Sequence, residues 1–184
     1  MKVSIKNITR NNVNEIPEPC RSCLYWENPS VLEQSRQELQ QKEKVEHAAM
    51  KVAWFLKTLE EFGNCGKILY TENKPIGYVQ YSTSNRFPNI KEYGAKKLRT
   101  SEENVAFISC LYISEEKFRG KGLGKKLLNE VIIDLRKRCF KAVETFARRG
   151  STNNPSGSIG LYLRKGFQVK EEIDLDFALV RLDL

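Results

Sequence analysis

Hydrophobic residues recur along the chain with two spacings, and the shorter spacing marks the strands. Val3–Ile8 alternates apolar and polar residues, as a strand with one buried face does. Val105–Ile113 is apolar almost without interruption, which is typical of a central strand buried on both faces. Two strands are predicted around the turn-forming residues "ENKP" within 66–83, another at Lys141–Arg148, and two more within 167–184.

The longer, helical spacing occurs in three segments. In Gly122–Arg138 the apolar residues fall on one side of a helix, namely Leu123, Leu127, Leu128, Val131 and Leu135. Segment 155–166 begins with proline and ends with glycine, as a short helix should. No proline or glycine interrupts Ser30–Phe62, and Gly63 offers a stop. We expect a long helix there with an apolar face made of Val45, Ala49, Val52, Ala53, Leu56 and Leu59. Its polar front part, 33–44, is expected to be exposed helix or a lid.

The order of these segments predicts an α/β fold with a mixed sheet, in which strands outnumber helices. The chain has 184 residues, which is enough to bury one sizeable hydrophobic core. We recognise neither an internal repeat nor a second core-forming segment, so we expect one domain over residues 1–184.

Composition narrows the class of protein further. A formal net charge of +8 points to anionic partners such as nucleic acid, an acidic surface or a phosphorylated cofactor. Five cysteines, an odd number, fit reduced thiols better than a disulfide framework. No stretch approaches the roughly 18 apolar residues of a membrane span, and the first residues lack the apolar block of a signal peptide. We therefore expect a cytoplasmic protein without membrane attachment.

A glycine-rich turn precedes the predicted helix at Gly122–Arg138. "RGKGLG" (Arg119–Gly124) would place backbone N–H groups without partners, and the positive end of the helix dipole, beside closely approachable glycines. Five cations surround it, namely Lys117, Arg119, Lys121, Lys125 and Lys126. The turn is a candidate anion site, and the alternative is a tight turn with a solvated basic face.

Two familiar phosphate motifs do not fit this turn. A P-loop, G-x-x-x-x-G-K-S/T, needs serine or threonine after its lysine, but Lys126 follows Lys125. A dinucleotide fingerprint needs G-x-G-x-x-G, whereas Gly120, Gly122 and Gly124 alternate here. The spacing therefore points to another class of anion site.

The turn and a second block together resemble the GNAT superfamily of N-acetyltransferases. "RGKGLG" matches the family signature Q/R-x-x-G-x-G/A, which holds the pyrophosphate of acetyl-CoA on backbone amides. About forty residues later "LYLRKGF" (Leu161–Phe167) is similar to the family block L-Y-x-K/R-x-G-F. The resemblance runs from about residue 66 to the C-terminus, and the opening strand also looks like the family's, whereas 17–62 and 84–104 match less clearly.

This resemblance implies a mostly antiparallel sheet, splayed near its middle and flanked by helices, with an acetyl-CoA-binding core at about 66–184. The pantetheine arm would lie between Val105–Ile113 and Lys141–Arg148, with the backbone of residues 111–113 polarising the thioester carbonyl. Six steps separate Ile113 from Arg119, where many members have five, so "SEEKF" is expected to form a longer bend. The cofactor-binding residues implied are Leu111, Tyr112, Ile113, Arg119, Gly120, Lys121, Gly122, Leu123, Gly124, Lys125 and Asn154.

Acetyl transfer to an amine requires an acid for the departing thiolate and a base or water path for the amine proton. The resemblance implies that Tyr162 is the general acid; the alternative is a core aromatic beside Phe167. Strand Val105–Ile113 has no carboxylate, so the base is open, and Glu144 is one distant candidate. We single out Glu27, beside two aromatics, as a base or amine-binding carboxylate, with a surface cap as its alternative.

Other residues that could carry chemistry are expected to be structural. His47 falls among charged residues of the predicted helix and is expected to be solvated. Cys20 and Cys23 form a C-x-x-C pair, but a structural zinc needs four ligands and no second pair is present. Cys110 and Cys139 are expected to be small core residues. We therefore predict no metal site.

The leading hypothesis is an N-acetyltransferase that moves an acetyl group from acetyl-CoA to an amine of a small molecule or a protein. The alternative is a non-catalytic module that senses CoA or holds nucleic acid; the absence of a basic stripe interleaved with aromatics argues against nucleic acid. A homodimer is left open. Segments 17–62 and 84–104 are expected to line the acceptor site, with Tyr25, Trp26, Phe87 and Tyr93 forming a partly apolar pocket.

Overall fold

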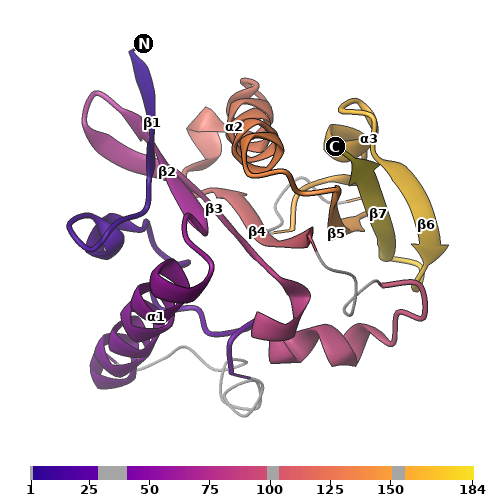
Figure 1. Ribbon diagram of the computed structural model, residues 1–184. Coiled ribbons are helices and arrows are strands. Elements are labelled where there is room, and N and C mark those ends of the chain that lie inside the picture. Colours follow the sequence, from indigo (N-terminus) through magenta and orange to yellow (C-terminus); the bar gives the residue numbers. More distant parts are fainter. Residues whose placement is uncertain (1, 29–40, 99–103, 151–155) are drawn as a thin grey trace.

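The computed structural model describes residues 2–28, 41–98, 104–150 and 156–184, which form one open seven-stranded sheet with helices on both faces (Figure 1). The strand order is β1-β2-β3-β4-β5-β7-β6. Within the described residues all neighbouring strands are antiparallel except the parallel pair β4 and β5. The strands are β1 (Val3–Asn7), β2 (Gly66–Thr71), β3 (Lys74–Ser82), β4 (Val105–Ile113), β5 (Ala142–Arg148), β6 (Gln168–Glu172) and β7 (Phe177–Asp183). The predicted α/β class with a mixed, mostly antiparallel sheet is confirmed.

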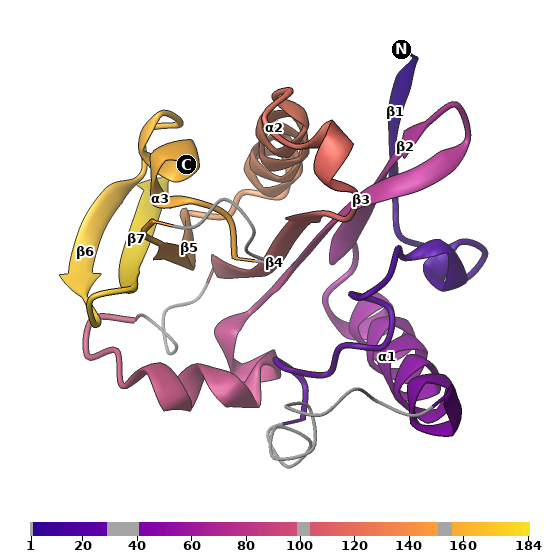
Figure 2. The same cartoon turned by 180° about the vertical axis from the view of Figure 1, so that it is seen from behind.

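The helices divide between the two faces of the sheet, as the two opposite views show (Figures 1 and 2). They are η1 (Val13–Glu15), α1 (Gln41–Glu61), η3 (Ser84–Arg86), η4 (Pro88–Tyr93), η5 (Glu116–Phe118), α2 (Leu123–Lys137) and α3 (Ile159–Leu163). Apolar side chains of α2 and α3 share one core cluster with the sheet. Those of η1, α1 and η4 pack against the other face.

Strand β4 is buried on both faces, as its apolar run predicts. Ala106, Ile108, Leu111 and Ile113 belong to the α2 side of the core, whereas Phe107, Cys110 and Tyr112 belong to the other side. The alternation shifts by one position at Ser109, where the pairing with β3 also shifts between Gln80 and Tyr81. One extra residue in β4 forms a bulge there, and a bulge bends the strand that carries it.

Beyond this bulge β4 separates from β5. The two strands pair only at their first three positions, Val105 with Ala142 through Phe107 with Glu144. At the next step a side chain replaces the backbone ladder, because Thr145 Oγ1 donates to the carbonyl of Ile108 over 2.8 Å. The sheet is therefore open between β4 and β5 along the second half of β4, which is the predicted splay.

The apolar face predicted for the long helix is only partly right: Val52 and Leu59 pack against the core, whereas Ala49 and Ala53 are exposed. The buried side chains of α1 are His47, Lys51, Phe55 and Thr58, which lie on one stripe of the helix, whereas Val45 is 62% exposed. The expectation missed this stripe because polar groups also pack inward when they have partners, and Lys51 has an ion-pair partner in the core. Residues 33–40 of the predicted front part lie outside the described residues.

Two further expectations are corrected. His47 is buried rather than solvated, because its place on α1 is on the stripe that faces the sheet. Cys139 is exposed rather than part of the core, because it follows the last turn of α2 in a left-handed conformation, with a φ of 58°. No helix among the described residues has the length and apolar character to cross a membrane.

The orientation of α1 can be tested by comparing two truncations. We expect Phe55→Ala to lower the free energy of unfolding by about 3–5 kcal/mol, because it leaves a cavity in the core. Val45→Ala should change it by no more than about 0.5 kcal/mol, because the side chain is exposed. Urea unfolding of both variants measures the difference. Similar losses in the two variants would contradict this orientation.

Candidate active site

The glycine-rich turn forms the N-terminus of α2. Gly120 and Gly122 have φ angles of 72° and 77°, a left-handed conformation that strains other residues. Gly122 is the N-cap of α2, and no side chain caps this end of the helix. A Cβ added at either glycine would meet nothing within 4 Å. The first N–H groups of α2 therefore face open space, where the helix dipole favours an anion.

This turn opens onto a cleft of about 350 Å³ between β4, α2 and α3. The predicted cofactor-binding residues that line it are Leu111, Tyr112, Ile113, Arg119, Gly120, Gly122, Leu123, Gly124 and Lys125. Lys121 is not among the lining residues, and Asn154 lies outside the described residues. Arg164 and Lys165 also line the cleft, so the second sequence block contributes two cations that we had not assigned to the site.

Arg119 holds the end of β4 in place. Its guanidinium donates to the carbonyls of Ile113 and Ser114 over 2.9 and 3.1 Å and to the hydroxyl of Tyr112 over 2.7 Å. It also lies over the Tyr112 ring, 5.1 Å from the centroid. These contacts give Arg119 a positioning function at the cleft: they fix the bend from β4 to the turn.

A second pocket of about 370 Å³ lies beside the first, on the other face of β4. Tyr112 lines both pockets. The remaining lining residues come from the segment around residues 19–26, from α1, β3, β4 and η4, and from the ends of β5 and β7. The described parts of segments 17–62 and 84–104 therefore contribute to a pocket, and its use as the acceptor site stays a prediction.

Aromatic rings form much of the wall of this second pocket. Trp26 is stacked on Tyr93 with ring centroids 5.5 Å apart, and Tyr25 meets the edge of Trp26 at 5.1 Å. The hydroxyls of Tyr25 and Tyr93 are 3.1 Å apart. Phe87 does not line the pocket and instead packs behind Trp26. Three of the four aromatics named from the sequence thus lie at the pocket.

A buried network of polar side chains lies next to the second pocket and includes two of its lining residues, Lys51 and Tyr78. Glu27 and Lys51 form an ion pair of 2.6 Å, and both side chains are only 4% exposed. Gln80 donates to the same carboxylate oxygen and accepts from Lys51 over 3.2 Å and from Tyr78. Burial by itself lowers the pKa of Lys51. The attraction and the hydrogen bond to Glu27, with a contribution from Cys23, outweigh that effect, so the pKa lies above its usual value. Lys51 and Tyr78 line the pocket, whereas Glu27 lies behind them.

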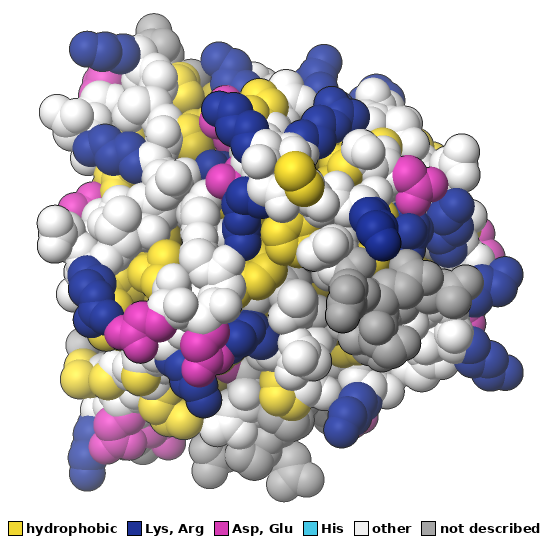
Figure 3. Space-filling model, in the orientation of Figure 1, with side chains coloured by type: hydrophobic (Ala, Val, Ile, Leu, Met, Phe, Trp, Pro, Cys, Tyr) yellow, Lys and Arg dark blue, Asp and Glu magenta, His cyan; other side chains and the backbone are white. Residues whose placement is uncertain are grey.

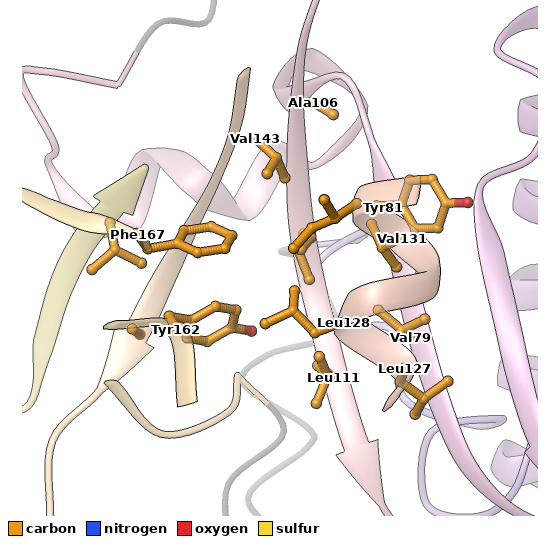
Figure 4. Close-up of a cluster of buried hydrophobic side chains, with 14 of the residues drawn as sticks. Val79, Tyr81, Ala106, Leu111, Leu127, Leu128, Val131, Val143, Tyr162 and Phe167 are labelled. Atoms are coloured by element: carbon orange, nitrogen blue, oxygen red, sulfur yellow. The ribbon is translucent and has the colours of Figure 1, made fainter. Parts of the chain in front are cut away.

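Tyr162 lies in the core between the two pockets. It is fully buried, its ring meets the edge of Phe167 at 5.1 Å, and its hydroxyl donates to the carbonyl of Ser156 over 2.8 Å. Figure 4 shows the ring among apolar side chains, with the hydroxyl directed toward Leu128 in this view. Burial raises the pKa of Tyr162 well above its usual value. Ser156 lines the second pocket and Gly157 lines the cleft, whereas Tyr162 itself lines neither.

The remaining candidates from the sequence are a carboxylate that lines neither pocket and three cysteines that line the second pocket. Glu144 is buried and accepts from Arg181 over 3.2 Å. Cys20, Cys23 and Cys110 line the second pocket as free thiols, and a hydrogen bond with Cys20 raises the pKa of Cys110. Among the described residues, no three His, Cys, Asp or Glu side chains gather as metal ligands would.

The fold recurs in solved acetyltransferase structures. The chain matches an N-acetyltransferase of Staphylococcus aureus Mu50 with a TM-score of 0.62, 15% identity, and coverage of 100% of this chain and 99% of that one. It matches the PaiA N-acetyltransferase of Thermoplasma acidophilum in complex with coenzyme A with a TM-score of 0.59, 12% identity and full coverage of both chains. A GNAT family acetyltransferase of Brucella melitensis in complex with acetyl-CoA matches with a TM-score of 0.56, 14% identity, and coverage of 100% and 88%.

Comparison at the level of sequence gives the family. No curated protein sequence matches significantly. The model of the acetyltransferase (GNAT) family matches residues 24–167, a range that includes the glycine-rich turn, β4, and the block at Leu161–Phe167. Since this match covers well over half of the chain, the protein belongs to the acetyltransferase (GNAT) family.

Proposed function

We propose that the protein transfers the acetyl group of acetyl-CoA to the amine of a small acceptor molecule. The observation that carries this proposal is the meeting of two pockets at the second half of β4. One pocket ends at an uncapped helix N-terminus with cations around it, and the other has aromatic walls. Such a pair suits an elongated phosphorylated donor on one side and a compact acceptor on the other.

The residues of the cleft fit acetyl-CoA. The N–H groups at the start of α2 would hold the pyrophosphate, with Lys125, Arg164 and Lys165 as counter-charges. The pantetheine arm would run along β4 where β5 is no longer paired with it. Structural neighbours crystallised with coenzyme A and with acetyl-CoA support the binding of acetyl-CoA. Bound there, acetyl-CoA supplies the thioester that is cleaved.

In the proposed reaction the amine nitrogen forms a bond to the acetyl carbon and the carbon–sulfur bond breaks. Backbone N–H groups within residues 111–113 would stabilise the charge on the carbonyl oxygen. Tyr162 would donate its proton to the departing thiolate, because burial keeps the phenol protonated and its hydroxyl is bonded to the carbonyl of Ser156, a residue that lines the second pocket. Water would accept the proton that the amine loses.

Glu27 has a positioning role in this proposal. Its carboxylate is neutralised by Lys51 and lies behind the lining residues, which disfavours the base role that the sequence suggested. The pair joins the segment before residue 28 to α1, and through Gln80 to β3. Glu27 therefore fixes the aromatic wall that its neighbours Tyr25 and Trp26 form.

A nucleic-acid-binding module is the weaker alternative. On the face that is seen in Figure 3, lysine and arginine side chains are scattered among acidic and uncharged groups and do not form one stripe. Four cations at the first cleft are accounted for by a phosphorylated donor and by the Arg119 contacts, namely Arg119, Lys125, Arg164 and Lys165. A measurement of CoA released from acetyl-CoA would distinguish the two functions, because an acetyltransferase cleaves the thioester whereas a sensor of the same fold need not.

Acetyl-CoA binding should depend on the turn at Gly122. We expect Gly122→Glu to weaken binding by about 10²-fold or more. The new carboxylate would lie where the pyrophosphate binds and would repel it. Gly94→Glu is the matched control, since Gly94 also has a positive φ with open space around it but does not line the cleft. Calorimetry measures both affinities. Equal affinities in the two variants would remove the pyrophosphate from this turn.

Removal of one hydroxyl tests the general acid. Tyr162→Phe should fold and bind acetyl-CoA but turn over about 10²-fold more slowly, the usual scale for one acid. Tyr70→Phe is the control, because it also removes a tyrosine hydroxyl hydrogen bond, to Glu15, and Tyr70 lines neither pocket. Pre-steady-state measurement isolates the chemical step. An unchanged rate of that step in Tyr162→Phe would exclude the acid role.

The Glu27–Lys51 pair should reveal itself in stability. Glu27→Gln should destabilise the protein by about 3–5 kcal/mol, because it leaves the buried Lys51 ammonium without a counter-charge. The double variant Glu27→Gln, Lys51→Met should recover most of this loss, because no buried charge remains. Urea unfolding of the two single variants and the double variant gives the coupling energy. Full stability of Glu27→Gln would contradict a structural ion pair.

A further inference from the structure

The second pocket has an unusual balance of charge for a site that receives an amine. Its lining includes two cations, Lys51 and Arg148, and no carboxylate among the described residues. Glu27, the carboxylate nearest in sequence to the aromatic wall, is already paired with Lys51. A cationic amine would therefore find no counter-charge on the described walls of this pocket. The acceptor must carry features that suit a positive, aromatic site.

Arg148 has capacity to bind an anion. It lies at the last position of β5, and its Nε is buried without a hydrogen-bond partner. Its ion-pair contact to a described residue is long, 3.8 Å from Nη2 to the exposed Asp176. The guanidinium lies 5.6 Å from the centroid of Phe177, which also lines the pocket. A buried donor without a partner costs free energy, and a carboxylate matches the fork of guanidinium N–H groups.

The walls of the pocket set the size and nature of the rest of the acceptor. A volume of about 370 Å³ is near the lower end of the range for small-molecule sites. Trp26, Tyr93 and Phe177 offer flat apolar surfaces, and Tyr93 is itself held by stacking on Phe146 at 4.1 Å. Rigid aromatic walls of this kind favour a ring or a large apolar group.

We propose that the acceptor is an amino acid with an aromatic or large apolar side chain, whose carboxylate pairs with Arg148 and whose side chain lies among the aromatic walls. This inference rests on the proposed acetyl transfer and names its acceptor class. The acceptor's own carboxylate supplies the negative charge that the pocket lacks. Arg148 is then a specificity-determining residue, because Lys51 is already paired with Glu27.

The same charge balance accounts for the missing general base. The neutral amine is the form that attacks a thioester. A free carboxylate on the walls would stabilise the unreactive ammonium, and the described walls carry none. An amine that arrives with its own carboxylate can bind here without that counter-charge from the protein.

Three related molecules separate the two charges of the acceptor. L-phenylalanine has both the carboxylate and the amine, 3-phenylpropionate has only the carboxylate, and 2-phenylethylamine has only the amine. Calorimetry with the CoA-saturated protein should show that L-phenylalanine and 3-phenylpropionate bind about tenfold to a hundredfold more tightly than 2-phenylethylamine, the range expected for one charged hydrogen-bonded contact. Binding of 2-phenylethylamine as tight as that of L-phenylalanine, or no binding of either carboxylate, would overturn the proposal.

Two adjacent arginines provide a matched pair of variants. Arg148→Gln should reduce the affinity for L-phenylalanine by a similar tenfold to hundredfold and leave that for 2-phenylethylamine unchanged. Arg149→Gln should change neither, because Arg149 is directed to Glu172 at 2.6 Å and does not line the pocket. If both variants lose affinity equally, or neither does, Arg148 does not bind the carboxylate.

Turnover separates this inference from the function on which it rests. With acetyl-CoA as donor, L-phenylalanine should have a higher kcat/KM than 2-phenylethylamine, and Arg148→Gln should remove that preference. Acetylation of 2-phenylethylamine in preference to L-phenylalanine would refute the acceptor class but leave the acetyltransferase intact. Failure to bind acetyl-CoA at all in calorimetry would instead refute the proposed function.

Discussion

The separation of β4 from β5 is the constraint on which the rest of the site depends. Backbone pairing between these strands stops at Phe107, and the bulge at Ser109 bends β4 away. A sheet opened in this way exposes backbone groups that would cost free energy if they were left buried without partners. Thr145 satisfies one of them, the carbonyl of Ile108. Those beyond it border the cleft, where a ligand or water can satisfy them.

The strands and the two motif-bearing helices could be predicted from the sequence because each has a strong local signal. Val105–Ile113 is long, apolar and bounded by polar residues, and burial on both faces follows directly. The turn at Gly122 could be predicted because only glycine takes a left-handed conformation at little cost. These signals come from residues close together in the chain, so sequence is sufficient to find them.

The second pocket could be predicted only in outline, because its contacts join residues far apart in the chain. Lys51 can be buried because it is paired with Glu27 and Gln80. Both partners are distant in the chain, so the sequence around Lys51 does not predict them. The hydropathy of α1 therefore located Val52 and Leu59 at the core but missed its buried polar stripe. Arg148 shows the same limit, since its place at the end of β5 beside Phe177 depends on how β5 and β7 pair.

Tyr112 makes the two pockets thermodynamically interdependent. Tyr112 lines both pockets, and Arg119, which lines the cleft, donates a hydrogen bond to its hydroxyl. Any shift of this ring on occupation of one pocket changes the shape of the other, and linkage requires the effect to be reciprocal. Through this one shared ring, a molecule bound in either pocket would alter the affinity of the other pocket by the same factor.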